Sequence, residues 1–167
     1  MEKHPGLFQD HLERYLSGPS KLSEKLAACA KEALDFELPD HWTIRQTVHH
    51  LADGDALWKI FILMALAGSE EPWQIPWYWS TGQREIATRW AYVRRDIASS
   101  LALLEANRKH TYELLQAFPE VGDKTLPVQW LDGKRELASI SEVIASQADH
   151  VEGHIEDIDA ILAAFTG

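Results

Sequence analysis

The segment TVHHLADGDALWKIFILMALAG, residues 47–68, is the strongest indication of the fold of this chain. Its second part, ALWKIFILMALAG, is apolar on nearly every side, which is typical of a helix buried inside a bundle. Thr43, a preferred N-cap residue, precedes the segment, and Gly68, a preferred residue at helix ends, closes it. The pattern therefore predicts a long buried helix over residues 43–67.

Three further stretches carry apolar residues at every third or fourth position, which is the helical period. They predict one helix over residues 19–34, one from residue 86 or 92 to 118, and one over 141–165 preceded by a Ser139–Glu142 capping box. A short helix over residues 7–16 is expected to end at SGPS, residues 17–20, because proline disrupts a helix interior. The four long helices favour an all-α, up-and-down four-helix bundle, with residues 1–18 as an N-terminal extension.

Two long connections separate the predicted helices. Residues 69–85, SEEPWQIPWYWSTGQRE, hold two prolines and three tryptophans, and a loop of this length is commonly functional or forms a lid. The alternative is that Trp73, Trp77 and Trp79 cap one end of the core or cover a dimer surface. Residues 119–139 contain LDGKR, a turn sequence that indicates a short hairpin.

Size, charge and cysteine content exclude several classes of protein. The chain has 167 residues and a net charge of −10, which suits one domain over residues 1–167 that does not bind nucleic acid. No run of 18 apolar residues predicts a membrane span. The lone Cys29 is expected to pack as a small buried helix residue and allows no internal disulfide. Because the N-terminus also has no apolar signal-peptide core, we expect a cytoplasmic protein.

A helical wheel separates the two adjacent histidines, because neighbouring residues on a helix point about 100° apart. With His50 at 0°, Leu57 and Phe61 fall within about 60° of it, so His50 is expected to face the core. His49 then lies at about −100°, near Asp53, on the rim of the helix. We expect His49 either to be solvated there or to orient a metal ligand without binding the metal itself.

His150 and His154 are four residues apart on the last predicted helix, and this spacing lets two imidazoles bind one ion. His154 lies inside the apolar arc of that helix and His150 lies at its edge. Together with His50 they form a candidate three-nitrogen metal site, of the kind that bundle cores build from facing helices. Four acids close to these histidines either orient an imidazole ring or are ordinary surface residues: Asp53, Asp149, Glu152 and Asp157.

WTIRQTVHHLAD, residues 42–53, and DHVEGHI, residues 149–155, resemble the signature of the DinB/YfiT-like superfamily. SLALLEANRKHTYELL, residues 100–115, is similar to the third helix of its YfiT branch, and the resemblance covers about residues 19–165. It implies a four-helix bundle, usually a homodimer, with one metal ion bound by His50, His150 and His154. The chain departs from the family pattern in two places: the connector between the first helix and HWTIRQ is short, and GD, Gly54 and Asp55, follows HLAD.

The resemblance implies a metal-dependent transferase that activates a low-molecular-weight thiol, such as bacillithiol, for attack on a small electrophile. Zinc or nickel is the expected cofactor, Asp53 is the expected residue that orients a ligand, and the tryptophan loop would cover the electrophile. A metal-dependent hydrolase that activates water at the same site is one alternative. A bundle that uses the metal only for stability is the other.

Overall fold

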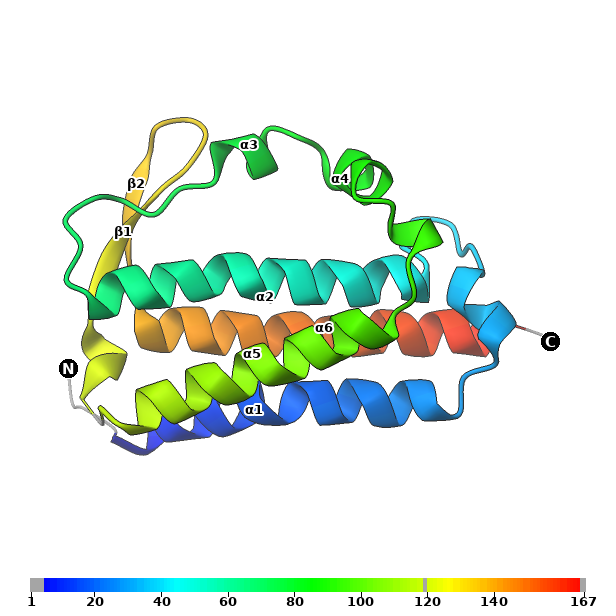
Figure 1. The fold of residues 1–167 in the computed structure, drawn as a ribbon, viewed down its shortest axis with the longest axis horizontal. Helices are drawn as coiled ribbons and strands as arrows, with labels where there is room; N and C mark the ends of the chain where they lie inside the picture. Colours follow the sequence, from blue (N-terminus) through cyan, green and yellow to red (C-terminus); the bar gives the residue numbers. More distant parts are fainter. Residues whose placement is uncertain (1–4, 119, 166–167) are drawn as a thin grey trace.

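Four long helices lie side by side in the computed structural model, which describes residues 5–118 and 120–165 (Figure 1). They are α1 Pro5–Ala27, α2 Ile44–Leu66, α5 Ala98–Gln116 and α6 Ile140–Ala164. Between them lie the short helices α3 Pro76–Trp79 and α4 Gln83–Arg89, the hairpin of β1 Thr125–Gln129 and β2 Arg135–Ser139, and 3₁₀ turns at Lys31–Asp35, Tyr92–Arg94 and Val121–Asp123. The predicted four-helix bundle is confirmed, and none of the described helices is long and apolar enough to cross a bilayer.

The helices are connected in an order that places α2 and α5 parallel. Each of α1 and α2 packs against both α5 and α6. The start of α2 meets the start of α5 through His49 and Ser100, and its middle meets the middle of α5 through Asp55 and Asn107. Residues 67–97 return along the bundle before α5 begins (Figure 1), so the chain reverses from α1 to α2 and from α5 to α6, but not from α2 to α5. The four-helix bundle therefore does not have the up-and-down order that the sequence favours, because this long connection makes α2 and α5 parallel.

Both helices that carry the candidate ligands begin with a capping box. Thr43 and Gln46 cap α2, and Ser139 and Glu142 cap α6, as the sequence predicts for α6. Gly68 adopts a φ of 69° just beyond α2, a conformation that glycine accepts without strain. The predicted hairpin is also present, and β1 pairs antiparallel with β2.

The helix break predicted at residues 17–20 is wrong, because α1 continues through Pro19. Proline has no N–H to donate to the carbonyl oxygen of Tyr15, four residues earlier. The buried Arg108 replaces that donor, and its Nη1 lies 2.9 Å from the Tyr15 oxygen. Gly18 provides the space, since a Cβ there would lie 2.7 Å from the same Nη1. Residues 5–18 are therefore part of the bundle rather than an extension to it.

Two other boundaries differ from the prediction. α1 ends at Ala27 rather than near residue 34, so Cys29 is half-buried beyond the helix end instead of buried within it. The third long helix begins at Ala98, because Ala91 adopts a φ of 55° and a 3₁₀ turn follows it. The predicted loop over residues 69–85 holds α3 and the first turn of α4.

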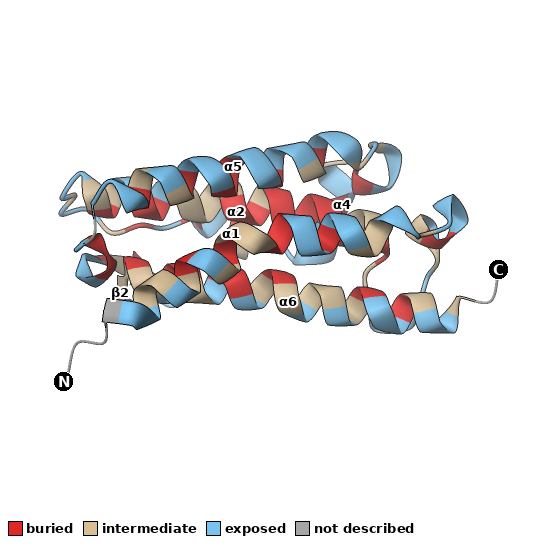
Figure 2. Ribbon diagram, turned by 90° about the horizontal axis from the view of Figure 1, so that it is seen from below, coloured by how far each residue is buried: buried red, intermediate tan, exposed pale blue. Residues whose placement is uncertain are grey.

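Buried residues face the interior of the bundle, and exposed residues cover its outer faces (Figure 2). A layer of buried polar side chains crosses this otherwise apolar core. Arg108 and Asp55 are each 1% exposed, and Arg108 Nε donates to Asp55 Oδ1 over 2.9 Å. Tyr15 Oη and Asn107 Nδ2 donate to the other oxygen of Asp55, over 3.2 and 3.0 Å. Arg108 Nη2 donates to the Gln147 carbonyl over 2.7 Å. This layer fixes α1, α2, α5 and α6 relative to one another.

Candidate metal centre

Three histidine side chains from two helices converge inside the bundle. One ring nitrogen from each of His50, on α2, and His150 and His154, on α6, lies within 4.8 Å of the others. The Nε2 atoms of His50 and His150 are 3.1 Å apart. Two nitrogens that bind one ion at about 2.0–2.1 Å lie roughly 2.9–3.4 Å from each other, so the observed separation suits a shared ion. The structure thus brings together the three histidines that the sequence singled out.

Burial keeps two of these imidazoles neutral near pH 7. It lowers the pKa of His50 to about 4, with a smaller contribution from the charge of His154. It lowers the pKa of His150 to about 3, and repulsion from the protonated forms of His50 and His154 and from Arg108 acts in the same direction. Because a metal binds the neutral form of imidazole, both side chains are available as ligands at neutral pH.

Contacts at the opposite ring nitrogens orient two of the three histidines. Nδ1 of His154 lies 3.0 Å from one oxygen of Asp157, and Nδ1 of His41 lies 3.4 Å from the other. Nδ1 of His50 lies 3.4 Å from the hydroxyl of Tyr78. A ring held at Nδ1 offers Nε2 to a metal, so Asp157 and Tyr78 are suited to fix the direction of two ligands.

Replacing Asp157 with alanine is expected to weaken zinc binding by about 10–100-fold, because the His154 ring loses the carboxylate that orients it. Competition with a chromophoric chelator measures this affinity. Asp159→Ala is the matched control, since Asp159 lies on the same helix and pairs with Lys25 instead. An Asp157→Ala affinity within about twofold of the wild type would show that the carboxylate has no such role.

Asp53 and His49 do not take the places that the sequence predicts. Asp53 accepts a hydrogen bond from the Tyr92 hydroxyl over 2.8 Å and lies 3.8 Å from Arg95, so its carboxylate is not bonded to any of the three imidazoles. His49 is fully buried rather than on the rim, and its Nδ1 lies 2.7 Å from the Ser100 hydroxyl. The reason is that α5 packs on this side of α2, which a wheel drawn for one helix cannot indicate.

A pocket of about 500 Å³ lies directly beside His50 and His150. One wall is largely aromatic and comes from α2 and the segment that follows it: Leu57, Trp58, Ile75, Tyr78 and Trp79. The other wall comes from α6: Ser146, Gln147 and Asp149. Gly54 also lines the pocket, and a Cβ there would make ordinary van der Waals contact with His150 Cε1 at 3.9 Å.

The three tryptophans of residues 69–85 have different environments. Trp79 lines the pocket. Trp73 is 2% exposed and stacks on Trp58 with the ring centres 4.2 Å apart, so it belongs to the core. Trp77 is 52% exposed. Tyr78, between two of them, and Gln147 are site residues that the sequence does not predict, although Tyr78 lies in the WYW stretch of the loop that was expected to cover the site.

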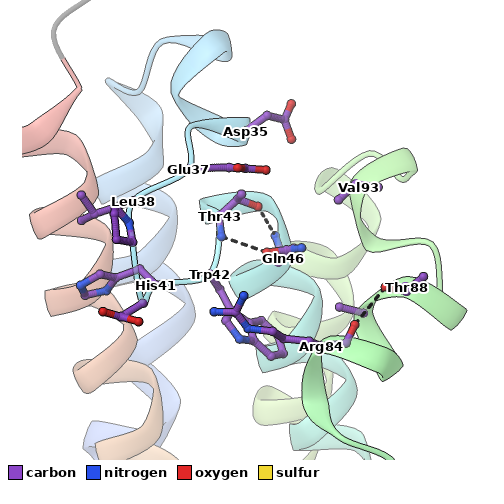
Figure 3. A pocket seen from close by; sticks show the side chains of 13 residues that line it. Asp35, Glu37, Leu38, His41, Trp42, Thr43, Gln46, Arg84, Thr88 and Val93 are labelled. Carbon is purple, nitrogen blue, oxygen red and sulfur yellow. Dashed lines mark hydrogen bonds between the residues drawn. The ribbon is translucent and has the colours of Figure 1, made fainter.

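A second hollow of about 650 Å³ lies at the N-terminal end of α2 (Figure 3). Figure 3 shows His41 on one side of it and Arg84, from α4, on the other. None of the three clustered histidines lines this hollow. Its wall nevertheless supports them, because the Trp42 ring packs against the His50 ring at 4.8 Å and His41 contacts Asp157.

Comparison with known proteins agrees with this architecture. Residues 15–158 match the DinB superfamily. The solved structure of YfiT from Bacillus subtilis is similar with a TM-score of 0.79 and 21% sequence identity, over 92% of this chain and 85% of that one. YfiT is described as a probable metal-dependent hydrolase with an unusual four-helix bundle topology. No curated protein matches the sequence.

Proposed function

The chain belongs to the DinB superfamily, and on that basis we propose that it is a metal-dependent transferase that joins a low-molecular-weight thiol to an electrophile. The observation that carries this proposal is the meeting of three imidazoles at the side of an aromatic pocket. His50, His150 and His154 would hold one divalent ion, zinc or nickel, and three protein ligands leave a position for a further ligand. An ion held there supplies Lewis-acid chemistry, which lowers the pKa of a thiol or water in that position.

The environment of the acids near the site favours activation of a thiol over activation of water. Asp149 is the carboxylate among the residues that line the pocket, and it is ion-paired with Arg14. Asp157 contacts His154, and Asp53 accepts from Tyr92. Water is a weaker acid than a thiol by roughly seven pKa units and so depends more on a general base. The described pocket offers no unpaired carboxylate for that task.

The protein's own side chains have distinct tasks in this proposal. Asp157 and Tyr78 hold two of the ligand rings in place. Trp58 and Trp79 form an apolar surface that takes the electrophile and keeps water from it. The nucleophile comes from the small thiol rather than from Cys29, which does not line the pocket and whose pKa is raised by burial.

The zinc- or nickel-loaded protein is expected to catalyse thiol transfer to a halogenated nitroaromatic acceptor. The S–H and carbon–halogen bonds break, a carbon–sulfur bond forms, and hydrogen halide is released. The measurement is thioether formation with bacillithiol, mycothiol, glutathione and cysteine, each beside a chelated control. We expect turnover with at least one thiol and its loss on chelation.

Two other outcomes would contradict the proposal in different ways. Turnover of ester or amide substrates without thiol, lost on chelation, would indicate a hydrolase. A lower melting temperature on chelation, without turnover of any substrate, would indicate that the metal only stabilises the bundle.

A further inference from the structure

Gln147 lies in the wall of the pocket beside the candidate metal site, three residues before His150 on α6. Its residue surface is 5% exposed, and its Oε1 has no hydrogen-bond partner among the residues that the structure describes. A buried amide oxygen without a partner costs free energy, and folded proteins seldom leave one unpaired. A molecule bound in the pocket that Gln147 borders could supply a hydrogen-bond partner for this amide.

The fold does not depend on the Gln147 side chain for the contact that fixes this part of α6. That contact is made by the main chain, because the Gln147 carbonyl accepts from Arg108 Nη2 over 2.7 Å. Arg108 is itself held by Asp55 and by the Tyr15 carbonyl. The main chain of Gln147 is therefore held by this contact, and a rotation of its side-chain amide would be enough to present one end of the amide to a molecule in the pocket.

The pocket lining determines which molecule would fit. Leu57, Trp58 and Trp79 form a surface suited to a flat apolar ring. No lysine or arginine is among the residues that line this pocket, so the lining offers no cation for a carboxylate or phosphate substituent. The terminal torsion of glutamine is broad, so the Gln147 amide can turn either its oxygen or its N–H₂ group outward. A hydroxyl group, which both donates and accepts, can pair with either.

We propose that the pocket binds a planar aromatic substrate with an uncharged hydroxyl or amide substituent, and that the Gln147 amide hydrogen-bonds to this substituent. The ring packs on the aromatic wall, and the substituent reaches α6 beside His150. This inference rests on the proposed function in taking the pocket as the site of the electrophile. It adds the substrate class and a specificity-determining residue.

The test compares 2-naphthol with 2-methylnaphthalene, which has a similar shape but no hydrogen-bonding group. Dissociation constants are measured by ligand-observed NMR with the full-length, zinc-loaded protein and without any thiol. We expect the wild type to bind 2-naphthol about fivefold more tightly, as one neutral hydrogen bond allows. Gln147→Met is expected to remove this preference, while its zinc content and melting temperature stay close to those of the wild type.

Gln83→Leu is the matched control, because Gln83 lines the same pocket from α4 but is exposed. It is expected to keep the preference within about twofold, since an exposed amide is open to solvent and gains little from a bound ligand. Equal binding of the two probes by the wild type, or a preference that survives in Gln147→Met, would overturn the inference. If Gln147→Met folds poorly, the comparison of the two probes in the wild type is sufficient by itself. Because no thiol is present, this result is independent of whether thiol transfer is found.

Discussion

Arg108→Ala is expected to lower the free energy of unfolding by about 3–5 kcal/mol, the usual cost of removing one partner from a buried ion pair. The carboxylate of Asp55 would lose its one cationic partner in the polar layer. Burial raises the pKa of Asp55 and Arg108 opposes that rise, so without Arg108 the carboxyl group would either stay charged in the core or take up a proton. The carbonyls of Tyr15 and Gln147 would also lose a donor. Urea unfolding followed by circular dichroism measures the loss.

Two further variants distinguish the contribution of the Asp55–Arg108 ion pair to stability from the general effects of substitution. Lys109→Ala changes an exposed neighbour on the same helix and is expected to alter stability by less than about 0.5 kcal/mol. Asp55→Leu combined with Arg108→Met removes both charges, so the double variant is expected to be more stable than either single substitution. A loss of less than about 1 kcal/mol in Arg108→Ala would mean that the layer does not hold the bundle together.

The role of Arg108 explains why the sequence misleads at residues 17–20. Gly18 and Pro19 normally indicate the end of a helix. In this protein the glycine admits the guanidinium, and the guanidinium bonds to the carbonyl that the proline leaves free. A donor supplied from another helix, 93 residues away in the sequence, cannot be deduced from a local pattern.

His50→Ala and His154→Ala are each expected to weaken zinc binding by more than about 100-fold, a greater loss than is usual for residues that only orient a ligand. Each substitution removes one of the three converging nitrogens, and the two imidazoles that remain are too few to hold the ion tightly. Metal content after dialysis and competition with a chelator measure the effect. His110→Ala, an exposed histidine on α5, is the control and is expected to bind zinc as the wild type does. A His50→Ala protein that retains one equivalent of zinc would refute the assignment.

The sequence predicts the parts of this site that depend on one helix at a time. The direction of His50 follows from the apolar residues that share its face, and the spacing of His150 and His154 follows from the helical repeat. The start of α6 follows from the Ser139–Glu142 capping box, which the structure contains. These features depend on residues only a few positions apart.

The features that the sequence does not predict depend on neighbours from other elements. His49 is buried because α5 covers it, and Asp53 is engaged by Tyr92 from the turn before α5. Tyr78 reaches His50 because residues 67–97 run back along the bundle (Figure 1). In each case the partner is fixed by the parallel arrangement of α2 and α5, which no local pattern encodes.

X-ray absorption at the zinc edge of the loaded protein shows directly whether the three histidines bind one ion. We expect one zinc ion per chain with three imidazole nitrogens at about 2.0–2.1 Å, and loss of this signal in His154→Ala. In the thiol-free wild type, a sulfur neighbour at about 2.3 Å, as a Cys29 thiolate would give, or a shell with fewer than three imidazoles would contradict it.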